Sequence, residues 1–401
     1  MPLTLSKTVQ SAVLVHQKMQ NKKPQIFIIA GEVSGDVLGA RIMRQMDDVE
    51  FIGIGGENMR AAGLQSLFPM SDLSVMGVIE VLAHARTLSR RIRQTVNEII
   101  RTRPDMVLTI DSPGFARSVI KQLRTSARGR KLIADGLKFH HVVAPQVWAW
   151  RPGRAKKYAK TFDKLYAFFD FELPYFTKYG LKTLAVGHPI ADGIIGKYDA
   201  TTTKTNPSDK IVTFVPGSRM SEVRRLMPLM RNVAEMIHNC GYRGYRFVIP
   251  TVETTADYVA NHVADWPVDV ELVPGAKRYE IYSKTYIAIV ASGTVSAELA
   301  MMHVPTIVVY RMNPITTWLI RNAIRVKWVS LVNILMNCGV YAEFLGGAAT
   351  SENVMCEFGQ LTIPSVREKM IAQLIRADKM WQPDTRGAAA KIADDIRDTL
   401  K

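Results

Sequence analysis

Residues 25–46 read QIFIIAGEVSGDVLGARIMRQM, and this stretch sets the pattern for the rest of the chain. An apolar run, IFIIA, leads into a turn with two glycines, and the turn leads into a segment of helical length, LGARIMRQM. A second apolar run, FIGIGG at 51–56, follows. Apolar strands joined by helix-length segments favour parallel pairing, with helices on both faces of the sheet.

The same order of strand, turn and helix recurs in two groups. The first group continues with DMVLTIDSPGF at 105–115, a helix at 117–128 and FHHVVAP at 139–145. The second group comprises KIVTFVPGSR at 210–219, YRFVIPT at 245–251, VDVELVPG at 268–275, YIAIVASGT at 286–294 and PTIVVYRM at 305–312. We therefore predict an α/β protein with two Rossmann-like, doubly wound domains.

A polar, threonine-rich segment, YDATTTKTNPSDK, separates the two groups and has the composition of a linker. The predicted parts are a loose N-terminal extension at 1–24, a first domain at 25–197, a linker at 198–210, a second domain at 211–380 and a C-terminal helix at 381–401. The extension is too poor in apolar residues for a secretory signal and lacks the arginines of a transit peptide. Because ligands of doubly wound folds bind at the carboxyl ends of the strands, we expect the two domains to face a cleft that holds the active site.

The composition narrows the functional classes. Of 401 residues, 47% are hydrophobic and 22% are charged, which excludes a fibrous or wholly disordered chain. The formal net charge of +16 favours an anionic partner, whether a nucleotide, a phospholipid headgroup or a nucleic acid. No stretch of the sequence approaches the roughly 18 apolar residues of a membrane-spanning helix. The three cysteines are too few and too scattered for a disulfide framework or a zinc site, which favours a reducing cytoplasm.

The turn AGEVSGD at 30–36 is the first of four turns with candidate site residues. Its two glycines permit a tight backbone path, and Glu32 and Asp36 are presented just beyond the strand. The turn lacks the spacing of the GxGxxG dinucleotide motif. In a structural interpretation, Ser34 or Asp36 caps the next helix.

The second turn, TIDSPGF at 109–115, presents Asp111 after an apolar strand and before a proline–glycine pair. A partly desolvated carboxylate at this edge can accept the proton of a substrate hydroxyl, as a general base must. The structural alternative is an Asx-turn, in which the carboxylate binds the backbone of its own loop.

The third turn lies in FVPGSRMSEVRRL at 214–226, where a strand runs into proline, glycine and serine and then into Arg219 at the start of a helix. Backbone amides of Gly217 and Ser218, the helix N-terminus and a guanidinium converge there, which suits a diphosphate. The alternative is a surface arginine after a turn. The coincidence of three anion-binding features favours phosphate.

The fourth turn lies in IVASGTVSAELAMMHVPTIVVY at 289–310. Gly293 and Thr294 offer unhindered amides to a phosphate, and Glu298, one helical turn further, is placed to bind a ribose diol. A helix-capping turn with a solvated glutamate is the alternative. Two anion-binding turns in the second domain favour a nucleotide diphosphate there.

Two segments mix basic residues with tryptophan and aliphatic residues. The first contains Trp148, Trp150, Arg151, Arg154, Lys156, Lys157 and Lys160. The second contains Arg311, Arg321, Arg325 and Lys327 among Trp318, Leu319, Ile320, Ile324, Val326 and Trp328. Such a surface suits contact with anionic lipid, and a solvated basic helix or a packed amphipathic helix is the alternative.

Eight blocks of this sequence, in this order, resemble the lipid-A-disaccharide synthase family of inverting glycosyltransferases. They are AGEVSGDVLGARI, GIGG, MGVIEVL, TIDSPGF, VVAPQVWAWRPGR, VGHPIADG, VPGSRMSEV and VASGTVSAELAMMHVPTIVVYRM, and they extend from about Ile26 to Leu345. The resemblance implies the two-domain GT-B fold. It also implies a reaction that joins UDP-2,3-diacylglucosamine to 2,3-diacylglucosamine 1-phosphate (lipid X), giving the β(1→6)-linked lipid A disaccharide 1-phosphate and UDP, without a metal or another cofactor.

The resemblance assigns roles to residues of this chain. Asp111 is expected to be the catalytic base, and Glu32 to orient the acceptor or act as an alternative base. His188 is expected to be structural or to support the site. The UDP-sugar site is expected to comprise Gly217, Ser218, Arg219, Gly293, Thr294, Glu298 and Asn333, and the acceptor and lipid side Gly31, Ser34, Trp148, Arg151 and Arg154. Because both substrates are bilayer amphiphiles, we expect a peripheral protein on the cytoplasmic face of the bacterial inner membrane that does not act on nucleic acid.

The sequence departs from the family pattern in two places. Between residues 337 and 346, where relatives read approximately GRELVPELLQ, this chain has Asn337, Cys338, Gly339, Ala342 and Gly346 at altered positions. The lost cationic and amide side chains predict weaker UDP binding or a changed donor. Gly114 replaces a second aspartate of the TIDSPGF turn. Two alternatives stay open: a degenerate paralogue that binds lipid or nucleic acid without catalysis, and a UDP-sugar 2-epimerase on the same scaffold.

Overall fold

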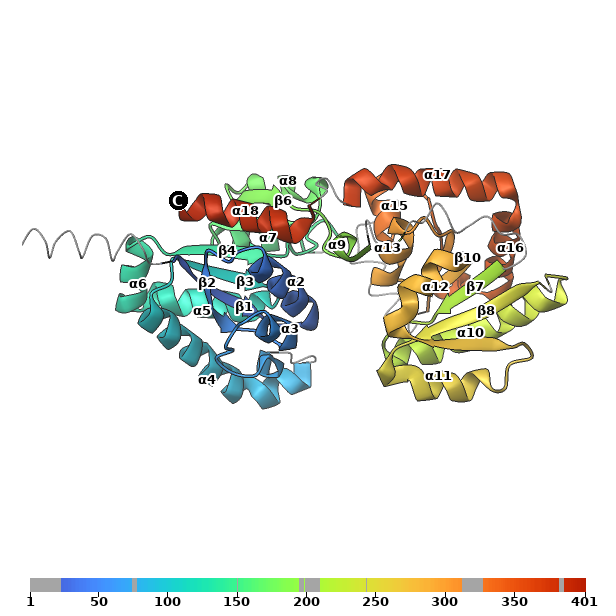
Figure 1. Cartoon of the computed structure of the whole chain (residues 1–401), viewed down its shortest axis with the longest axis horizontal. Coiled ribbons are helices and arrows are strands. Elements are labelled where there is room, and N and C mark those ends of the chain that lie inside the picture. Colours follow the sequence, from blue (N-terminus) through green and yellow to red (C-terminus); the bar gives the residue numbers. More distant parts are fainter. Residues whose placement is uncertain are drawn as a thin grey trace, which may run out of the picture. The chain divides into compact units, whose positions relative to one another are not determined.

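A computed structural model describes residues 23–73, 78–149, 151–194, 198, 210–242, 244–311, 327–381 and 386–401, and at 78–84 it describes the backbone alone. The chain forms two compact units. Unit 1 contains the described residues up to Pro145, Gly153–Val186 and Ala388–Lys401, and unit 2 contains Gln146–Pro152 and the described residues of Gly187–Gly387. Figure 1 shows that each unit is a sheet flanked by helices.

The sheet of unit 1 has six parallel strands in the order β2-β1-β3-β4-β5-β6. They are β1 (Gln25–Ala30), β2 (Glu50–Ile54), β3 (Met106–Ile110), β4 (Lys138–Val142), β5 (Lys164–Ala167) and β6 (Lys182–Ala185). Strands β1 and β3 are buried along their whole length. Helices cover both faces of a parallel sheet, so its buried strands are rich in apolar residues.

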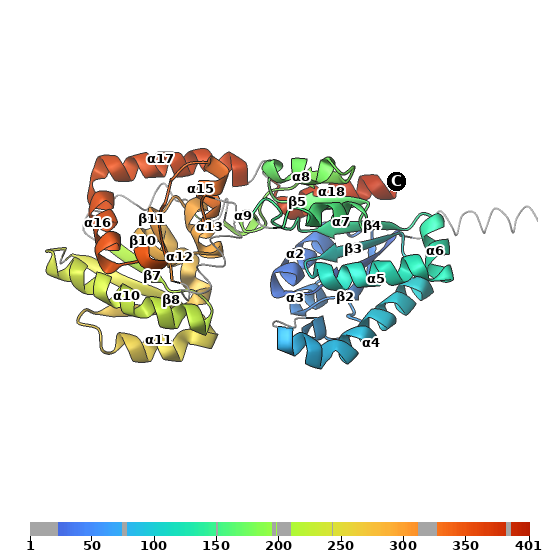
Figure 2. The ribbon, with the colours of Figure 1, turned by 180° about the vertical axis from the view of Figure 1, so that it is seen from behind.

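The helices of unit 1 are α2 (Val33–Arg44), α3 (Glu57–Ala61), α4 (Val78–Thr102), α5 (Pro113–Thr125), α6 (Ala127–Ala134), α7 (Arg154–Ala159), α8 (Pro174–Thr177) and α18 (Ala388–Leu400), with 3-10 turns at Met70–Leu73 and Asp170–Glu172. Helix α2 packs against α18, and α4 packs against α5 and α6 (Figures 1 and 2). The sequence predicted one helix at 117–128, but the structure has two, because the Ser126 hydroxyl accepts a hydrogen bond from the Gly129 amide at 3.0 Å and begins α6.

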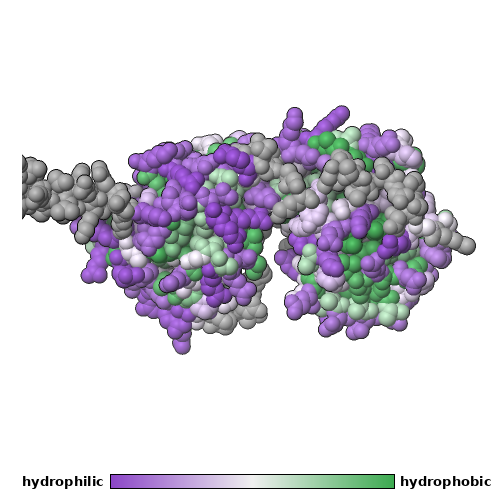
Figure 3. All heavy atoms as spheres, viewed as in Figure 1, coloured by the Kyte–Doolittle hydropathy of each residue, from purple (hydrophilic) through white to green (hydrophobic). Residues whose placement is uncertain are grey.

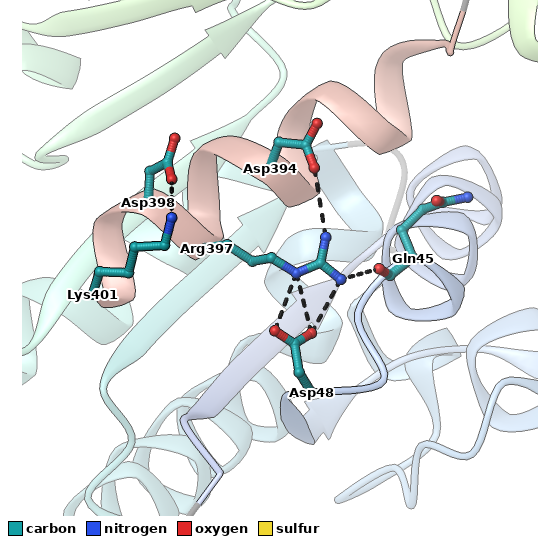
Figure 4. Close-up of polar contacts among 6 residues, drawn as sticks. All are labelled: Gln45, Asp48, Asp394, Arg397, Asp398 and Lys401. Atoms are coloured by element: carbon teal, nitrogen blue, oxygen red, sulfur yellow. Dashed lines mark hydrogen bonds and ion pairs between the residues drawn. The ribbon is translucent and has the colours of Figure 1, made fainter.

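The C-terminal helix α18 completes unit 1. Its Ile392 and Ile396 are fully buried in one core with Ile26 and Ile28 of β1. Figure 4 shows Arg397 of this helix reaching the connection between α2 and β2, where it is hydrogen-bonded to both Asp48 carboxylate oxygens and to the Gln45 carbonyl oxygen. The last residues of the chain therefore fold with the first strand.

The sheet of unit 2 also has six parallel strands, in the order β12-β11-β10-β7-β8-β9. They are β7 (Lys210–Val215), β8 (Tyr245–Thr251), β9 (Val270–Pro274), β10 (Thr285–Ala291), β11 (Thr306–Tyr310) and β12 (Ala342–Leu345). Its helices are α9 (Ala191–Ile194), α10 (Met220–Asn239), α11 (Ala256–Val263), α12 (Arg278–Lys284), α13 (Thr294–Met301), α15 (Leu331–Met336), α16 (Ser351–Thr362) and α17 (Pro364–Trp381), with 3-10 turns at Glu253–Thr255, Gly275–Lys277 and Gly346–Ala348.

Every apolar run quoted above contains a strand, and the predicted fold class is confirmed by two parallel, helix-flanked sheets. Three short edge or near-edge strands, β5, β6 and β12, were not predicted. Each has four residues, too few for a periodic pattern to stand out. Residues 1–22 of the predicted extension and 199–209 of the predicted linker lie outside the described residues.

Candidate active site

The strand order of unit 1 brings two candidate turns to one edge of its sheet. Ala30 at the end of β1 pairs with Ile110 at the end of β3, and Ile110 pairs with Val142 at the end of β4. The turns that begin at Gly31 and Asp111 therefore leave the sheet side by side. This is the edge where ligands of parallel α/β sheets bind.

Asp111 stands in an uncommon backbone conformation. Its φ is 55° and that of Ser112 is 42°, both in the left-handed region. The Asp111 amide donates to the Val142 carbonyl oxygen at 2.7 Å, and the Ser34 hydroxyl donates to the Asp111 carboxylate at 3.2 Å. The carboxylate thus meets a side chain from α2, which favours a site residue over an Asx-turn. Two consecutive left-handed residues hold it at the sheet edge, and backbone strain of this kind gathers at functional sites.

The surroundings of Asp111 raise the pKa of its carboxyl group and so make the carboxylate a stronger base. Burial and the negative charge of Glu32 both raise the pKa of Asp111, and the hydrogen bond from Ser34 lowers it; the net result is a pKa of about 6. Glu32 itself lies exposed at the N-cap of α2 and makes no side-chain capping bond. A carboxylate with a pKa near 6 is ionised at neutral pH and is a stronger base than an ordinary aspartate.

Two glycines of the first turn are needed because this turn and the Asp111 turn lie very close together. A Cβ on Gly31 would lie 1.8 Å from the Ser112 hydroxyl oxygen, and a Cβ on Gly35 would lie 2.9 Å from an Asp111 carboxylate oxygen. A Cβ on Gly114, by contrast, would meet no atom within 4 Å, so the aspartate of relatives would have room there. The glycines of the first turn thus let the two turns come together.

Asp36 has a structural role that differs from both sequence interpretations. Its carboxylate accepts hydrogen bonds from the backbone amides of Gly56 at 2.7 Å, Asn58 at 2.9 Å and Met59 at 3.1 Å. Burial pushes the pKa of Asp36 upward, but the hydrogen bonds from Asn58, Met59 and Gly56 outweigh burial and lower it. Asp36 therefore fixes the N-terminus of α3 rather than capping its own helix or facing a ligand.

The residues expected on the acceptor and lipid side are divided between the units. Trp148 and Arg151 lie in the segment Gln146–Pro152 of unit 2, and Arg154 begins α7 of unit 1. In unit 1 burial raises the pKa of Tyr158 to about 12, while the charges of Arg154 and Arg117 lower it and that of Asp111 raises it. Arg154 and Asp111 therefore act on the same buried hydroxyl.

Part of the predicted basic and aromatic surfaces falls outside the described residues, namely Trp150, Trp318, Leu319, Ile320, Arg321, Ile324, Arg325 and Val326. Arg311 is described, and its guanidinium donates to the Ala349 carbonyl oxygen at 2.7 and 2.9 Å. Lys327 lies over the ring of Trp328 at 4.8 Å. Arg311 thus ties the end of β11 to the segment that precedes α16.

In unit 2 the structure brings six expected residues around one pocket of about 330 Å³. These are Gly217, Ser218, Arg219, Gly293, Thr294 and Glu298. The pocket lies where β7, β8, β9 and β10 end, and its lining also includes Glu222, Pro250, Val252, Gly275, Arg278 and Tyr282. It has the position and the amide-rich turns of a nucleotide site.

The turn after β7 is shaped around a glycine and an arginine. Gly217 has a φ of 109°, and a Cβ there would lie 2.6 Å from a Glu222 carboxylate oxygen. Arg219 is the N-cap of the 20-residue helix α10, and its side chain is 71% exposed although it forms an ion pair with Glu222 at 3.1 Å. A cation and a long helix N-terminus therefore lie together, which favours an anion.

The turn after β10 supplies a buried carboxylate. Gly293 is the N-cap of α13, and a Cβ there would meet nothing within 4 Å, so the space beside it is open. Glu298 is only 8% exposed, and its carboxylate accepts hydrogen bonds from the Tyr279 hydroxyl at 2.9 Å and from the Arg278 guanidinium at 3.3 and 3.4 Å. The alternative of a solvated glutamate is therefore wrong.

Arg278 was not predicted as a site residue, although the sequence carries a signal for it. The segment VPGAKR at 273–278 repeats the pattern of VPGSR at 215–219, in which an apolar strand runs into proline, glycine and then arginine. Both arginines line the same pocket. A comparison of the residues that follow each predicted strand would have identified Arg278 as a candidate site residue.

Asn333, which was expected to bind the donor sugar nucleotide, is fully buried, and all four hydrogen-bonding positions of its side-chain amide are used within the chain. Its amide nitrogen donates to the Tyr341 carbonyl oxygen and to Glu343, each at 2.8 Å, and its amide oxygen accepts from the Val340 and Tyr341 amides, each at 2.8 Å. An asparagine side chain has no further strong hydrogen-bonding position. We therefore assign Asn333 to the support of the altered loop and not to a donor contact.

The altered loop is organised by Glu343. Its carboxylate accepts hydrogen bonds from the amides of Val329 and Ser330, both at 2.9 Å, and from the Ser330 hydroxyl at 2.7 Å. Gly339 packs under Trp328, since a Cβ there would lie 3.0 Å from the indole ring. The altered segment at 337–346 is therefore held by two polar side chains, Asn333 and Glu343, whose partners lie within the chain.

His188, which was expected to be structural or to support the site, contacts Trp381 in unit 2. Its amide donates to the Trp381 carbonyl oxygen at 2.9 Å, and its ring lies edge-on to the Trp381 ring with centroids 6.3 Å apart. Burial lowers the pKa of His188 to about 4, so the ring is neutral at pH 7. Within the described ranges, the structure contains no cluster of three or more His, Cys, Asp or Glu side chains placed to hold a metal ion.

The family model described as lipid-A-disaccharide synthetase matches residues 26–383. The lipid-A-disaccharide synthase of Rhodospirillum centenum is 40% identical over 357 residues, which are 86% of this chain and 87% of that protein. The lipid-A-disaccharide synthase of Paramagnetospirillum magneticum is 40% identical over 332 residues, which are 80% of this chain and 83% of that protein.

Solved structures share the fold at much lower identity. Staphylococcus aureus MnaA in complex with UDP superimposes with a TM-score of 0.60 at 12% identity, over 94% of this chain and 97% of that one. Acinetobacter baumannii MurG superimposes with a TM-score of 0.58 at 13% identity, over 94% of this chain and 100% of that one. The similarity to these structures shows the two-domain fold alone.

Proposed function

This chain belongs to the lipid-A-disaccharide synthetase family, and we propose from that premise that it transfers an acylated glucosamine from UDP to lipid X. It is a glycosyltransferase of lipid A biosynthesis. The proposed donor is UDP-2,3-diacylglucosamine and the product is the β(1→6)-linked disaccharide 1-phosphate. The observation that carries this assignment is a pocket at four strand ends of unit 2 that combines Arg219, a helix N-terminus and a buried carboxylate.

The donor site of this proposal is the unit 2 pocket. The diphosphate would meet the amides of Gly217, Ser218 and Thr294 and the exposed guanidinium of Arg219, and the ribose would meet Glu298. When the bond to the anomeric carbon breaks, negative charge develops on the leaving diphosphate. Donors that are fixed before the reaction stabilise this charge without reorganisation.

The acceptor side of this proposal lies at Asp111 in unit 1. Inversion requires the 6-hydroxyl of lipid X to attack the anomeric carbon on the face opposite UDP while a base takes its proton. Asp111 is ionised at pH 7 with a pKa near 6, and Ser34 orients its carboxylate. We assign Glu32 to the orientation of the acceptor, because it is exposed beside Asp111 and its charge already acts on it.

We further propose that the protein works at the surface of an anionic membrane. Among the described residues, no helix has the length and hydropathy needed to cross a bilayer. Unit 1 carries a basic groove of about 960 Å³ between α4 and the α5–α6 pair, with an apolar floor that includes Val96 and Leu132. Its basic residues are Arg93, Arg101, Arg103, Arg128 and Lys131. Figure 3 shows that hydrophilic residues cover much of the face of unit 1 drawn there, with apolar residues between them. A groove lined by basic residues suits anionic headgroups.

The reaction is tested with the purified protein and its two acylated sugars. We expect a disaccharide monophosphate and UDP in equal amounts, and we expect Arg219→Ala to lower kcat roughly 10²–10³-fold. Incubation with UDP-N-acetylglucosamine alone tests for epimerase activity in the same assay. Epimerised sugar without disaccharide would contradict the proposed function, and so would wild-type turnover in Arg219→Ala.

A further inference from the structure

We propose that Arg278 and Tyr279 are positioning residues that fix Glu298 as a hydrogen-bond acceptor and thereby make the unit 2 pocket discriminate against nucleotides that lack one of the two ribose hydroxyls. The proposal deepens the proposed function and rests on it, because the nucleotide is the donor's UDP. It names two residues that no part of the proposed catalytic chemistry uses. Neither is required to touch the nucleotide.

Glu298 is held from two directions by its neighbours. The Arg278 guanidinium donates from Nη2 to Oε1 at 3.3 Å and from Nε to Oε2 at 3.4 Å, and the Tyr279 hydroxyl donates to Oε1 at 2.9 Å. Arg278 and Tyr279 begin α12, whereas Glu298 lies in α13. The carboxylate therefore cannot rotate without breaking bonds to another helix.

Arg278 is itself anchored, so it can hold Glu298 in place. Its Nη1 donates to the Gly275 carbonyl oxygen at 3.1 Å, and its Nη2 donates to the Tyr279 hydroxyl at 2.9 Å. The guanidinium also lies over the Tyr279 ring, 4.3 Å from the centroid. A site residue whose supporting shell is fixed presents one geometry to its ligand.

Both neighbours of Glu298 remain donors at every physiological pH. Arginine does not lose its proton in proteins, and the surroundings of Arg278 raise its pKa further: burial opposes this, but the charge of Glu298 and its hydrogen bond outweigh burial. Burial raises the pKa of Tyr279 to about 12, and the charge of Glu298 adds to the effect. The neighbours of Glu298 are thus a positively charged guanidinium and a hydroxyl that donates its hydrogen. In these surroundings the Glu298 carboxylate acts as a hydrogen-bond acceptor.

The count of acceptor positions predicts what Glu298 recognises. An ionised carboxylate has about four acceptor positions. Tyr279 and Arg278 Nη2 occupy Oε1, and Arg278 Nε occupies one position of Oε2. One position on Oε2 is left for a donor from the ligand, which suits a single ribose hydroxyl. A nucleotide that lacks this hydroxyl leaves a nearly buried acceptor unpaired, which is costly.

The test compares three nucleotides by isothermal titration calorimetry on the full chain: UDP, 2′-deoxy-UDP and 3′-deoxy-UDP. For the wild-type protein we expect one deoxy analogue to bind about tenfold or more weakly than UDP. In Arg278→Met and in Tyr279→Phe, the ratio of the dissociation constant of that deoxy analogue to the dissociation constant of UDP falls towards one. Arg278→Lys does not restore the ratio, because a lysine cannot form the forked pair.

The matched control is Arg246→Met, which removes an exposed arginine from an ion pair with Glu271 on a neighbouring strand of unit 2. This variant is expected to keep the wild-type ratio. The thermal midpoint of each variant reports folding, and Tyr279→Phe decides the question if Arg278→Met does not fold.

The outcomes separate this inference from the proposed function. If the wild-type protein binds none of the three nucleotides, the proposed donor site is wrong. If it binds UDP and both deoxy analogues equally, or if Arg278→Met and Tyr279→Phe weaken all three nucleotides by the same factor, the positioning role is wrong and the donor site stands.

Discussion

At the scale of single residues, the chemistry of this protein depends on carboxylates in contrasting surroundings. Asp111 is half-buried near Glu32 and has a raised pKa. The pKa of Asp36, in the first turns of α2, is lowered despite burial by hydrogen bonds from the Asn58 side chain and from three backbone amides. Glu298 is buried but paired with a guanidinium. One carboxylate is thus suited to take up a proton, one to hold a helix and one to accept a hydrogen bond from a ligand.

The Asp111 assignment predicts opposite effects of one substitution on rate and on stability. Asp111→Asn should lower kcat by 10²–10⁴-fold, the usual contribution of a general base, while UDP affinity stays unchanged. The wild-type rate should fall about tenfold per pH unit below pH 6, since protonation removes the base. Product formation is measured from pH 5 to 8. A wild-type profile that is flat through pH 6 would contradict the role of Asp111.

The stability of the same variant follows from the sign of the pKa shift. The pKa of Asp111 is raised from 3.8 to about 6 in the folded state, so this group stabilises the fold most below its unfolded pKa, and that stabilisation is lost as pH rises through about 6. At pH 7, Asp111→Asn should therefore raise the free energy of unfolding, on the order of 1 kcal/mol. Chemical denaturation at pH 7 measures the difference.

At the scale of elements, the site depends on how closely two turns approach. Gly31→Ala should place a methyl group on the Ser112 side chain, since a Cβ there would lie 1.8 Å from its oxygen. We expect a loss of about 1–3 kcal/mol in the free energy of unfolding and a large loss of activity. Gly114→Ala, with nothing within 4 Å, is the control in the neighbouring turn and should keep both. Equal effects of the two substitutions would show that close packing of the turns is unimportant.

Helix α18 is the element whose role is most readily tested by stability. Ile396 is fully buried against the core that contains β1, so Ile396→Ala should cost about 2–5 kcal/mol. The control is Lys401→Ala at the residue that follows this helix, which removes an ion pair with Asp398 at the surface and should give no measurable change. Thermal unfolding monitored by circular dichroism checks both. An Ile396→Ala midpoint equal to that of the wild type would show that unit 1 does not need this helix.

At the scale of the whole molecule, the net charge of +16 governs encounters with anions. Vesicles that contain phosphatidylglycerol should bind the protein, vesicles of phosphatidylcholine should not, and binding should weaken with salt. Arg128→Glu with Lys131→Glu reverses two charges of the basic groove and should lower binding to anionic vesicles about tenfold or more. Flotation of vesicles on a density gradient measures the bound fraction.

The control for the groove is Lys178→Glu with Lys182→Glu, which makes the same change of charge on two exposed lysines elsewhere in unit 1. If this pair weakens vesicle binding as strongly as the groove pair, net charge and not the groove attracts the membrane. Binding to both kinds of vesicle alike would contradict the electrostatic basis.

The fold class and the two turns of the unit 2 pocket could be read from the chain because they depend on neighbours in sequence. Burial of a central parallel strand on both faces favours a near-continuous apolar run, and β1, β3, β7 and β10 all show one. Glycines and helix starts at strand ends predict anion-binding turns in the same local way. The short strands β5, β6 and β12 were missed because four residues carry too little pattern.

The pairing of polar groups, in contrast, became visible in the folded chain alone. Asn333 satisfies the loop at 340–343 and not a donor, Arg278 meets Glu298 from another helix, and Asp36 holds α3. Asp395 of α18 accepts a hydrogen bond from the Tyr166 hydroxyl at 2.8 Å, across 229 residues of sequence. A buried polar group must find a partner wherever the packing of distant segments places one. Local patterns give the position of such a group, and the whole fold gives its partner.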